Sequence, residues 1–318
     1  MVRDVAGSGR PIKVALFVGL VVAWGLNYIF VREGLPYAAP LWLAFLRSGV
    51  GALGAAAIVG LRASRSRLDR AARRDALLLG IPNTALFFGL WFVAAGSVLP
   101  GIASVVVYTF PLWVAVFSGP VLHRRVGPVD GLAIVGGFVG VVLIAQPCQA
   151  GAGQLPLVAV LELLAGAVSW ATGTVVAQRR FPPSDLIEVN AYQLAGGATA
   201  LFVASVLFEG GTVPVPSAPL LGIVLWLGLV GTSFGYAVWF WLLGRTHASR
   251  LSAYVFLVPV VALAASSLLF GERLDLLQVV GVAAVLAALY AIGVHARPPT
   301  PLTDRTTAPS PTRLDGRL

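Results

Sequence analysis

Long apolar runs recur along almost the whole chain, and each is close to the length needed to cross a lipid bilayer. A transmembrane helix needs about 20 predominantly apolar residues. Ten such runs can be marked, at approximately residues 12–32, 38–61, 75–95, 100–122, 128–146, 156–178, 187–208, 218–243, 250–270 and 276–295. Only 11% of the residues are charged, whereas soluble domains carry about 25%. We therefore expect an all-α membrane protein with ten transmembrane helices.

The basic residues indicate the orientation of these helices. If the N-terminus is cytoplasmic and the helices alternate, every Lys and Arg except Arg32, Arg47 and Arg273 falls at the cytoplasmic side. Cytoplasmic loops of membrane proteins carry this excess of positive charge. The net charge of +9 is thus explained without nucleic acid. We predict a multi-pass protein of the cell membrane with both termini in the cytoplasm.

The two halves of the chain resemble each other at one nearly constant offset. Trp24 matches Trp170, Arg47 matches Gln193, and the segment Phe88–Phe92 matches Tyr236–Phe240. Five helices per half is an odd number, so the second half must be inverted relative to the first, a design that recurs in secondary transporters. The predicted organisation is a cytoplasmic N-terminus (1–11), a first unit (12–146), a non-cytoplasmic linker (147–155), a second unit (156–295) and a disordered cytoplasmic tail (296–318).

Several short motifs resemble the EamA family of the drug/metabolite transporter superfamily. They are Trp24-Gly25-Leu26-Asn27, Phe45-Leu46-Arg47, Leu257-Val258-Pro259 and Phe270-Gly271-Glu272-Arg273, followed by Gln278-Val279-Val280-Gly281. The first unit departs from the pattern, because His123-Arg124-Arg125 stands where Gly-Glu is expected. The resemblance implies ten helices in two units, and export or exchange of a small polar metabolite, such as an amino acid, by alternating access.

Arg47 is the most informative single residue, because it lies about nine residues into an apolar helix. An arginine at membrane depth is costly unless it is paired or solvated. It is expected either to bind a substrate carboxylate or to pair with helix carbonyls or an acid. Other polar and aromatic residues at this depth are expected to line a central cavity. The candidate binding residues are Arg47, Asn27, Tyr28, Tyr108, Trp170, Thr174, Asn190, Gln193, Tyr236 and Trp239.

Three further residues are candidates for a role in coupling or motion. Glu162 is a candidate proton-coupling carboxylate, with an interfacial position near the headgroups as the alternative. Pro111 and Pro259 occupy matched positions within helices, where proline removes a backbone hydrogen bond and kinks the helix. Matched interruptions in two repeats are typical of the substrate site or of the moving helices.

The sequence shows no nucleotide-binding loop, no cluster of metal ligands and no catalytic triad. We therefore expect no cofactor, no metal and no enzymatic activity. The expected partners are a small-molecule substrate and the lipid bilayer, with possible proton coupling, in a monomer or homodimer. Two alternatives stay open at this point. An intramembrane enzyme would need clustered acids, histidines or a nucleophile, and a lipid scramblase would need a hydrophilic cavity open to lipid.

Overall fold

The computed structural model describes residues 10–61, 68–122, 127–145, 156–210, 212–243 and 257–295. The predicted linker 147–155 and tail 296–318 lie outside these ranges. The described residues contain helices and no strand, which confirms the expected all-α membrane fold. The elements are α1 (Arg10–Gly34), α2 (Pro40–Leu61), α3 (Arg70–Gly80), η1 (Ile81–Leu86), α4 (Phe87–Ala94), α5 (Pro100–Val107), α6 (Phe110–Leu122), α7 (Pro128–Ala145), α8 (Leu157–Arg180), η2 (Pro183–Asp185), α9 (Leu186–Glu209), α10 (Ala218–Leu225), η3 (Trp226–Phe234), α11 (Gly235–Leu243), α13 (Leu257–Phe270) and α14 (Leu276–His295).

The helices correspond in position to the apolar runs of the sequence. Seven segments of the described chain are long and apolar enough to span a membrane: Ile12–Gly34, Pro40–Leu61, Arg70–Ala94, Pro100–Phe117, Leu157–Arg180, Leu186–Glu209 and Ala218–Trp239. Three shorter apolar helices, Pro128–Ile144, Leu257–Phe270 and Leu276–Ile292, occupy the remaining runs. The full count of ten spanning helices stays a prediction.

Local sequence signals fix where several helices begin. Proline stands at the first position of α2, α5 and α7, where its missing N–H costs nothing and its fixed φ favours the helix. The Asp69 side chain caps α3 by accepting a 2.7 Å hydrogen bond from the Ala72 backbone N–H. Ser217 caps α10 in the same way through Leu220. These caps satisfy backbone donors that have no partner within the helix.

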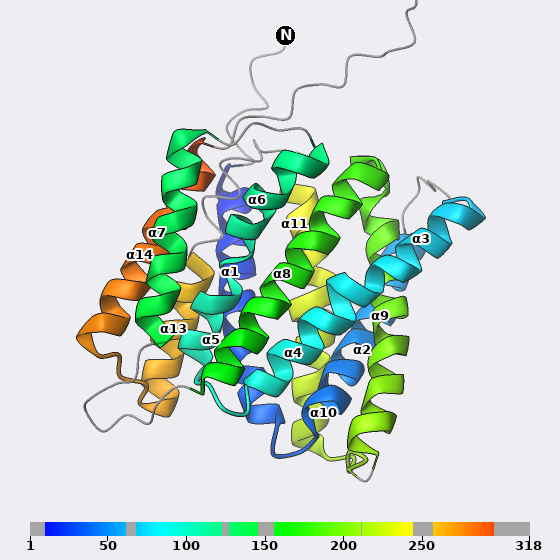
Figure 1. Ribbon diagram of the computed structural model, residues 1–318. Coiled ribbons are helices and arrows are strands. Elements are labelled where there is room, and N and C mark those ends of the chain that lie inside the picture. Colours follow the sequence, from blue (N-terminus) through cyan, green and yellow to red (C-terminus); the bar gives the residue numbers. More distant parts are fainter. Residues whose placement is uncertain are drawn as a thin grey trace, which may run out of the picture.

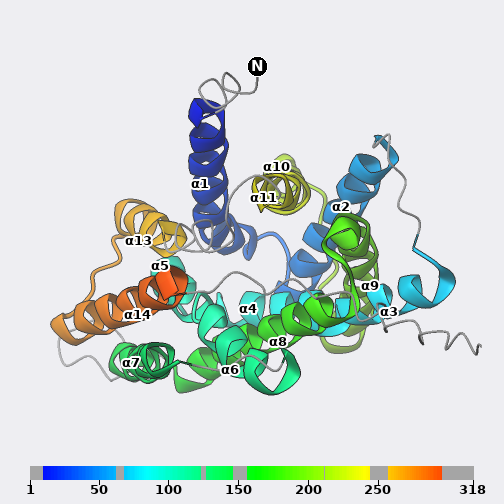
Figure 2. The same cartoon turned by 90° about the horizontal axis from the view of Figure 1, so that it is seen from above.

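Contacts between the two halves come in equivalent pairs. Helix α1 packs on α13, and its counterpart α8 packs on α6. Helix α2 packs on η3, and its counterpart α9 packs on η1. Two further pairs join direct counterparts, α2 with α9 and α7 with α14, and Figure 2 shows these pairs at opposite sides of the bundle. This exchange of partners is the pattern that a two-fold relation between repeats produces.

The counterpart helices run in opposite directions. Figure 1 shows α1 starting at the upper end of the bundle and α8 starting at the lower end. The first turn of α1 and the last turn of α14 both lie at the upper end. The end of the bundle that holds Gly34, Pro40, Pro100 and Phe270 is therefore opposite to both of these turns, and we call it the Glu272 end.

The third helix of each repeat contains a π-helical segment. The offset that relates Phe88 to Tyr236 also relates η1 to the second part of η3. In η1, Pro82 cannot donate a backbone hydrogen bond, and the Ser169 hydroxyl donates to its carbonyl at 2.7 Å. In η3, the Thr232 hydroxyl donates to the Leu227 carbonyl at 2.7 Å. Such wide turns occur frequently at functional sites.

Candidate functional site: a central cavity around Arg47

A small cavity lies between the two repeats and is walled mainly by aromatic side chains. Its volume is about 30 Å³, which is enough for water, since a water needs about 10–15 Å³. Typical ligand sites measure about 300–1,000 Å³. The cavity is therefore too small for a metabolite in this conformation, and its walls must separate to admit one. The lining residues are Trp24, Asn27, Tyr28, Arg47, Phe87, Phe88, Trp91, Tyr108, Trp170, Gly231 and Tyr236.

Arg47 extends from α2 and is the only charged residue among those that line the cavity. The residue is 3% exposed. Its Nε donates to the Thr232 Oγ1 at 3.2 Å, and its Cζ lies 4.0 Å from the centroid of the Phe88 ring and 5.1 Å from that of Trp91. These rings favour a cation over their faces. Among the residues that the structure describes, no carboxylate forms an ion pair with Arg47.

One nitrogen of the Arg47 guanidinium has no hydrogen-bond partner among the residues that the structure describes. This atom, Nη1, is buried. A buried donor without a partner costs about 1–3 kcal/mol, so such atoms are rare in folded proteins. Two other atoms on the cavity residues share this state, the Trp91 Nε1 donor and the Asn27 Oδ1 acceptor. Two donor atoms and one acceptor atom of the cavity residues are thus buried without a partner in the described part of the chain.

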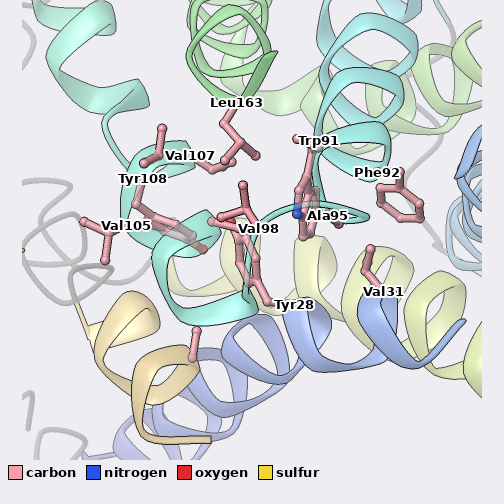
Figure 3. Packing of buried hydrophobic residues seen from close by; sticks show 14 of the residues in the cluster. Tyr28, Val31, Trp91, Phe92, Ala95, Val98, Val105, Val107, Tyr108 and Leu163 are labelled. Atoms are coloured by element: carbon pink, nitrogen blue, oxygen red, sulfur yellow. The ribbon is translucent and has the colours of Figure 1, made fainter. Parts of the chain in front are cut away.

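Aromatic contacts hold the walls in place. Tyr28 of α1 lies 4.4 Å from Trp91 and 6.4 Å from Tyr108, measured between ring centroids, and Figure 3 shows these three side chains gathered from α1, α4 and the end of α5. Trp170 of α8 lies 6.4 Å from Tyr108 and stacks on Phe110 at 3.7 Å and on Phe87 at 4.7 Å. Both repeats therefore contribute aromatic rings to the cavity wall.

Close backbone approach positions the α1 side chains. The Trp24 Nε1 donates to the Gly231 carbonyl at 3.1 Å, and its ring lies 5.9 Å from Tyr236. A Cβ on Gly231 would contact the Asn27 side-chain amide, and one on Gly235 would lie 2.6 Å from the Trp24 Nε1. Glycine at these two positions is what lets η3 and α11 approach the polar face of α1.

Of the ten predicted binding residues, six line the cavity and four lie outside its lining. Arg47, Asn27, Tyr28, Tyr108, Trp170 and Tyr236 all line the cavity. Trp239 lies outside the lining, with its ring 5.8 Å from Trp24. The Thr174 hydroxyl donates at 2.8 Å to the Trp170 carbonyl of its own helix.

Asn190 and Gln193 form a separate polar cluster with Asn83 of η1. The Gln193 Nε2 donates to the Asn190 Oδ1 at 2.8 Å, and the Asn83 Nδ2 donates to the Gln193 Oε1 at 2.6 Å. The Gln193 Oε1 thus joins α9 to η1, while its Nε2 bonds within α9. None of these three residues belongs to the cavity lining.

The coupling and kink candidates also have defined places. Glu162 is half-buried on α8 and is not among the lining residues. The helix expected over 100–122 is interrupted at Tyr108 and Thr109, directly before Pro111. Pro259 lies in α13 near the start of its described part, so the backbone that precedes residue 257 lies outside the described residues.

Sequence reasoning left five lining residues out of the site. They are Trp24, Phe87, Phe88, Trp91 and Gly231. The repeat match between Phe88–Phe92 and Tyr236–Phe240 could have identified Phe88, because its counterpart Tyr236 was predicted to bind substrate. Within the described part of the chain, no group of three or more His, Cys, Asp or Glu residues lies close enough to hold a metal ion.

The fold and the cavity together define a multi-pass membrane protein with a central site between two repeats. The model of the EamA-like transporter family matches this chain twice, at residues 11–146 and 157–294. The chain belongs to this family and is a membrane transporter.

Relatives that match this chain over most of their own length are also named as transporters or efflux pumps. An uncharacterized transporter of Bacillus subtilis (strain 168), YvbV, is 28% identical over 89% of this chain and 92% of its own length. A protein of Escherichia coli (strain K12) named as a probable amino-acid metabolite efflux pump is 30% identical over 85% of this chain and 91% of its own. One solved crystal structure has a TM-score of 0.62 at 21% identity, covering 90% of this chain and 97% of that one, which indicates the same fold.

Proposed function

We propose that this protein is a secondary transporter that exports or exchanges a small polar metabolite carrying a carboxylate, such as an amino acid, by alternating access. The single observation that carries the proposal is the buried side chain of Arg47, which lines the cavity and whose Nη1 has no hydrogen-bond partner among the described residues. An arginine binds a carboxylate through planar, charge-assisted hydrogen bonds.

The remaining unpaired atoms favour a substrate that also carries a donor group. The Asn27 Oδ1 would accept from an amine, while the Trp91 Nε1 would donate to a second carboxylate oxygen. The ring faces of Trp24 and Trp170 offer apolar contact to the rest of the molecule. Among the lining residues there is no acid to neutralise a second positive charge, which disfavours a cationic substrate. The printed name of the Escherichia coli relative supports the choice of amino acids as the first candidates.

The site also supports the proposed transport cycle. Its small volume requires the walls to move before a substrate can enter, and the paired contacts between repeats would allow each half to adopt the conformation of the other. We place both termini in the cytoplasm, because the basic residues gather at that side. Cysteine labelling of engineered terminal residues in intact cells tests that orientation.

The function is tested by flux in proteoliposomes. Purified protein is reconstituted, and uptake and counterflow are measured against a panel of amino acids, their acylated derivatives and their decarboxylated amines. We expect movement of one or more carboxylates and no movement of the matching amines. The absence of flux for the whole panel, with protein that remains folded and monodisperse, would contradict the proposal. Movement of the amines alone would contradict the role of Arg47.

A further inference from the structure

Glu272 is a buried carboxylate that binds the start of a helix from the other repeat. It lies 5% exposed between α13 and α14. Its Oε2 accepts a 2.9 Å hydrogen bond from the Gly101 backbone N–H, and its Oε1 accepts a 3.0 Å bond from that of Ile102. These N–H groups belong to the first turn of α5, where a helix lacks internal partners and favours negative charge.

The backbone around this contact is shaped to permit it. Gly271 adopts a positive φ of 65°, which other residues rarely adopt. A Cβ on Gly101 would lie 2.5 Å from the Glu272 Oε2 and 2.7 Å from Leu263. Both glycines are therefore needed for the carboxylate to reach α5.

Glu209 makes an equivalent contact to a second helix of the first repeat. Its Oε1 accepts from the Leu41 N–H at 3.0 Å, and its Oε2 accepts from the N–H groups of Leu41 and Trp42, each at 3.1 Å. Leu41 and Trp42 lie in the first turn of α2. Two acids of the second repeat thus cap two helix N-termini of the first repeat, both at the Glu272 end.

The two capped helices are those that carry cavity side chains. Helix α2 carries Arg47, and α5 ends at Tyr108. Any motion that separates the repeats at the Glu272 end must pull these N-termini away from their carboxylates. Charge-assisted hydrogen bonds are about twice as strong as neutral ones, so each cap opposes that motion.

The described contacts at the opposite end are weaker. The Glu188 Oε1 accepts one 3.3 Å hydrogen bond from the Leu68 N–H, and its Oε2 has no partner within the described ranges. Asp75 pairs with Arg180 at 2.8 Å, with 26% and 49% of the two side chains exposed. Exposed ion pairs of this kind contribute little. In the sequence, the position that matches Glu272 in the first repeat is Arg124, so the first repeat lacks the corresponding acid.

We propose that Glu272 and Glu209 form a two-point clamp that keeps the Glu272 end of the transporter closed, and that both caps must break when this end opens. The clamp acts on the conformational equilibrium and does not contact the substrate. It biases the resting protein toward a state whose opposite end opens first. Because this end is predicted to be non-cytoplasmic, the bias favours loading from the cytoplasm, as export requires.

The test is the rate at which a buried cysteine becomes reactive. Val98 is 1% exposed and lies between α4 and α5 near the Glu272 end, so Val98→Cys reports opening there. The reporter is placed in a Cys148→Ser background, because Cys148 is the chain's single cysteine. Protein in lipid nanodiscs is treated with a polar maleimide in the absence of substrate. The readout needs no flux, so it stays informative even if the proposed transport activity fails.

Two variants break the same cap by different routes. Glu272→Gln keeps the shape but turns an amide donor against one of the two backbone N–H groups. Gly101→Ala leaves the charge and pushes the carboxylate away. We expect each to raise the modification rate of Val98→Cys about tenfold or more, as the loss of a charge-assisted hydrogen bond to a buried group implies. Combining Glu272→Gln with Glu209→Gln should raise it further.

Asp75→Asn is the matched control, because it neutralises an acid at the opposite end. It should leave the rate at Val98→Cys unchanged or lower it. An unchanged rate in both Glu272→Gln and Gly101→Ala, with normal elution and thermal unfolding, would overturn the clamp. An equal increase in Asp75→Asn would also overturn it, since that outcome indicates general loosening.

Discussion

Arg47 and Gln193 occupy equivalent positions in the two repeats, and each hydrogen-bonds a side chain in the π-helical segment of the opposite repeat. The Arg47 Nε donates to Thr232 of η3 at 3.2 Å, and the Gln193 Oε1 accepts from Asn83 of η1 at 2.6 Å. The two sites differ in what is left over. Gln193 uses both amide atoms within the protein, whereas the Nη1 of Arg47, a residue of the cavity lining, has no partner among the described residues. The two repeats therefore form similar hydrogen bonds at these positions, but only the first repeat places a cation there.

Replacing Arg47 is expected to weaken carboxylate binding strongly while the fold survives. Arg47→Gln keeps a donor for Thr232 but removes the charge that the substrate would meet. The loss of a charge-assisted hydrogen bond costs about 1.5–3 kcal/mol, which is about a 10–100-fold weaker affinity. Counterflow of the substrate identified by the panel measures the change. Arg47→Lys should fail as well, because an ammonium cannot bind Thr232 and a carboxylate in one plane. Flux retained in both variants would contradict the anchor role.

Much of the fold follows from the sequence because bilayer crossing imposes a length and an apolar composition on each helix. The helices α2, α8 and α9 lie close to the runs marked for them. The π-helical segments were not predicted. A wide turn depends on which backbone carbonyl remains free to accept the next helical hydrogen bond, and a nearby hydroxyl or proline changes that pairing. Ser169, for example, reaches Pro82 from a helix that lies far away in the chain.

The site could be predicted only in part for a related reason. Arg47 stands out because charge at membrane depth is costly. Phe88 and Trp91 carry no such cost, and they resemble ordinary core residues until α2 brings a cation over their faces. Glu272 likewise stands out only as a motif residue. Its role depends on the distant start of α5, which no local pattern contains.

Gln193→Leu tests whether Gln193 binds substrate or supports the fold. The variant removes two hydrogen bonds and leaves the Asn83 and Asn190 side chains without those partners. Because each unsatisfied buried group costs about 1–3 kcal/mol, we expect a clearly lower thermal unfolding temperature. Apparent substrate affinity in counterflow should stay unchanged, because Gln193 lies outside the cavity lining. A large loss of affinity at unchanged stability would instead restore the binding role predicted from the sequence.

Gly231→Ala is expected to reduce transport by displacing the Asn27 side chain of α1. The new Cβ would meet the Asn27 amide and displace it from its place in the cavity lining, because the Trp24 hydrogen bond holds α1 close to η3. We expect flux to fall at least about tenfold, the effect of displacing one polar contact worth about 1.4 kcal/mol. Gly222→Ala is the control, because a Cβ there meets nothing within 4 Å. Equal flux in the two variants would show that the approach of η3 to Asn27 does not shape the site.

Gly140→Ala tests the contact that joins the fifth helices of the two repeats. A Cβ on Gly140 would lie 2.6 Å from the Gly281 carbonyl, and one on Gly281 would lie 2.6 Å from the Gly140 carbonyl. The backbones of α7 and α14 are therefore in direct contact, and overpacking of this kind costs about 1–3 kcal/mol. Alanine alone would favour a helix over glycine by about 1 kcal/mol, so the two effects oppose each other. The steric cost should prevail at Gly140, and the thermal unfolding temperature should fall.

At Gly136 a Cβ meets nothing within 4 Å, so Gly136→Ala should leave that temperature unchanged or raise it. The same response in both variants would mean that α7 and α14 are not packed through Gly140.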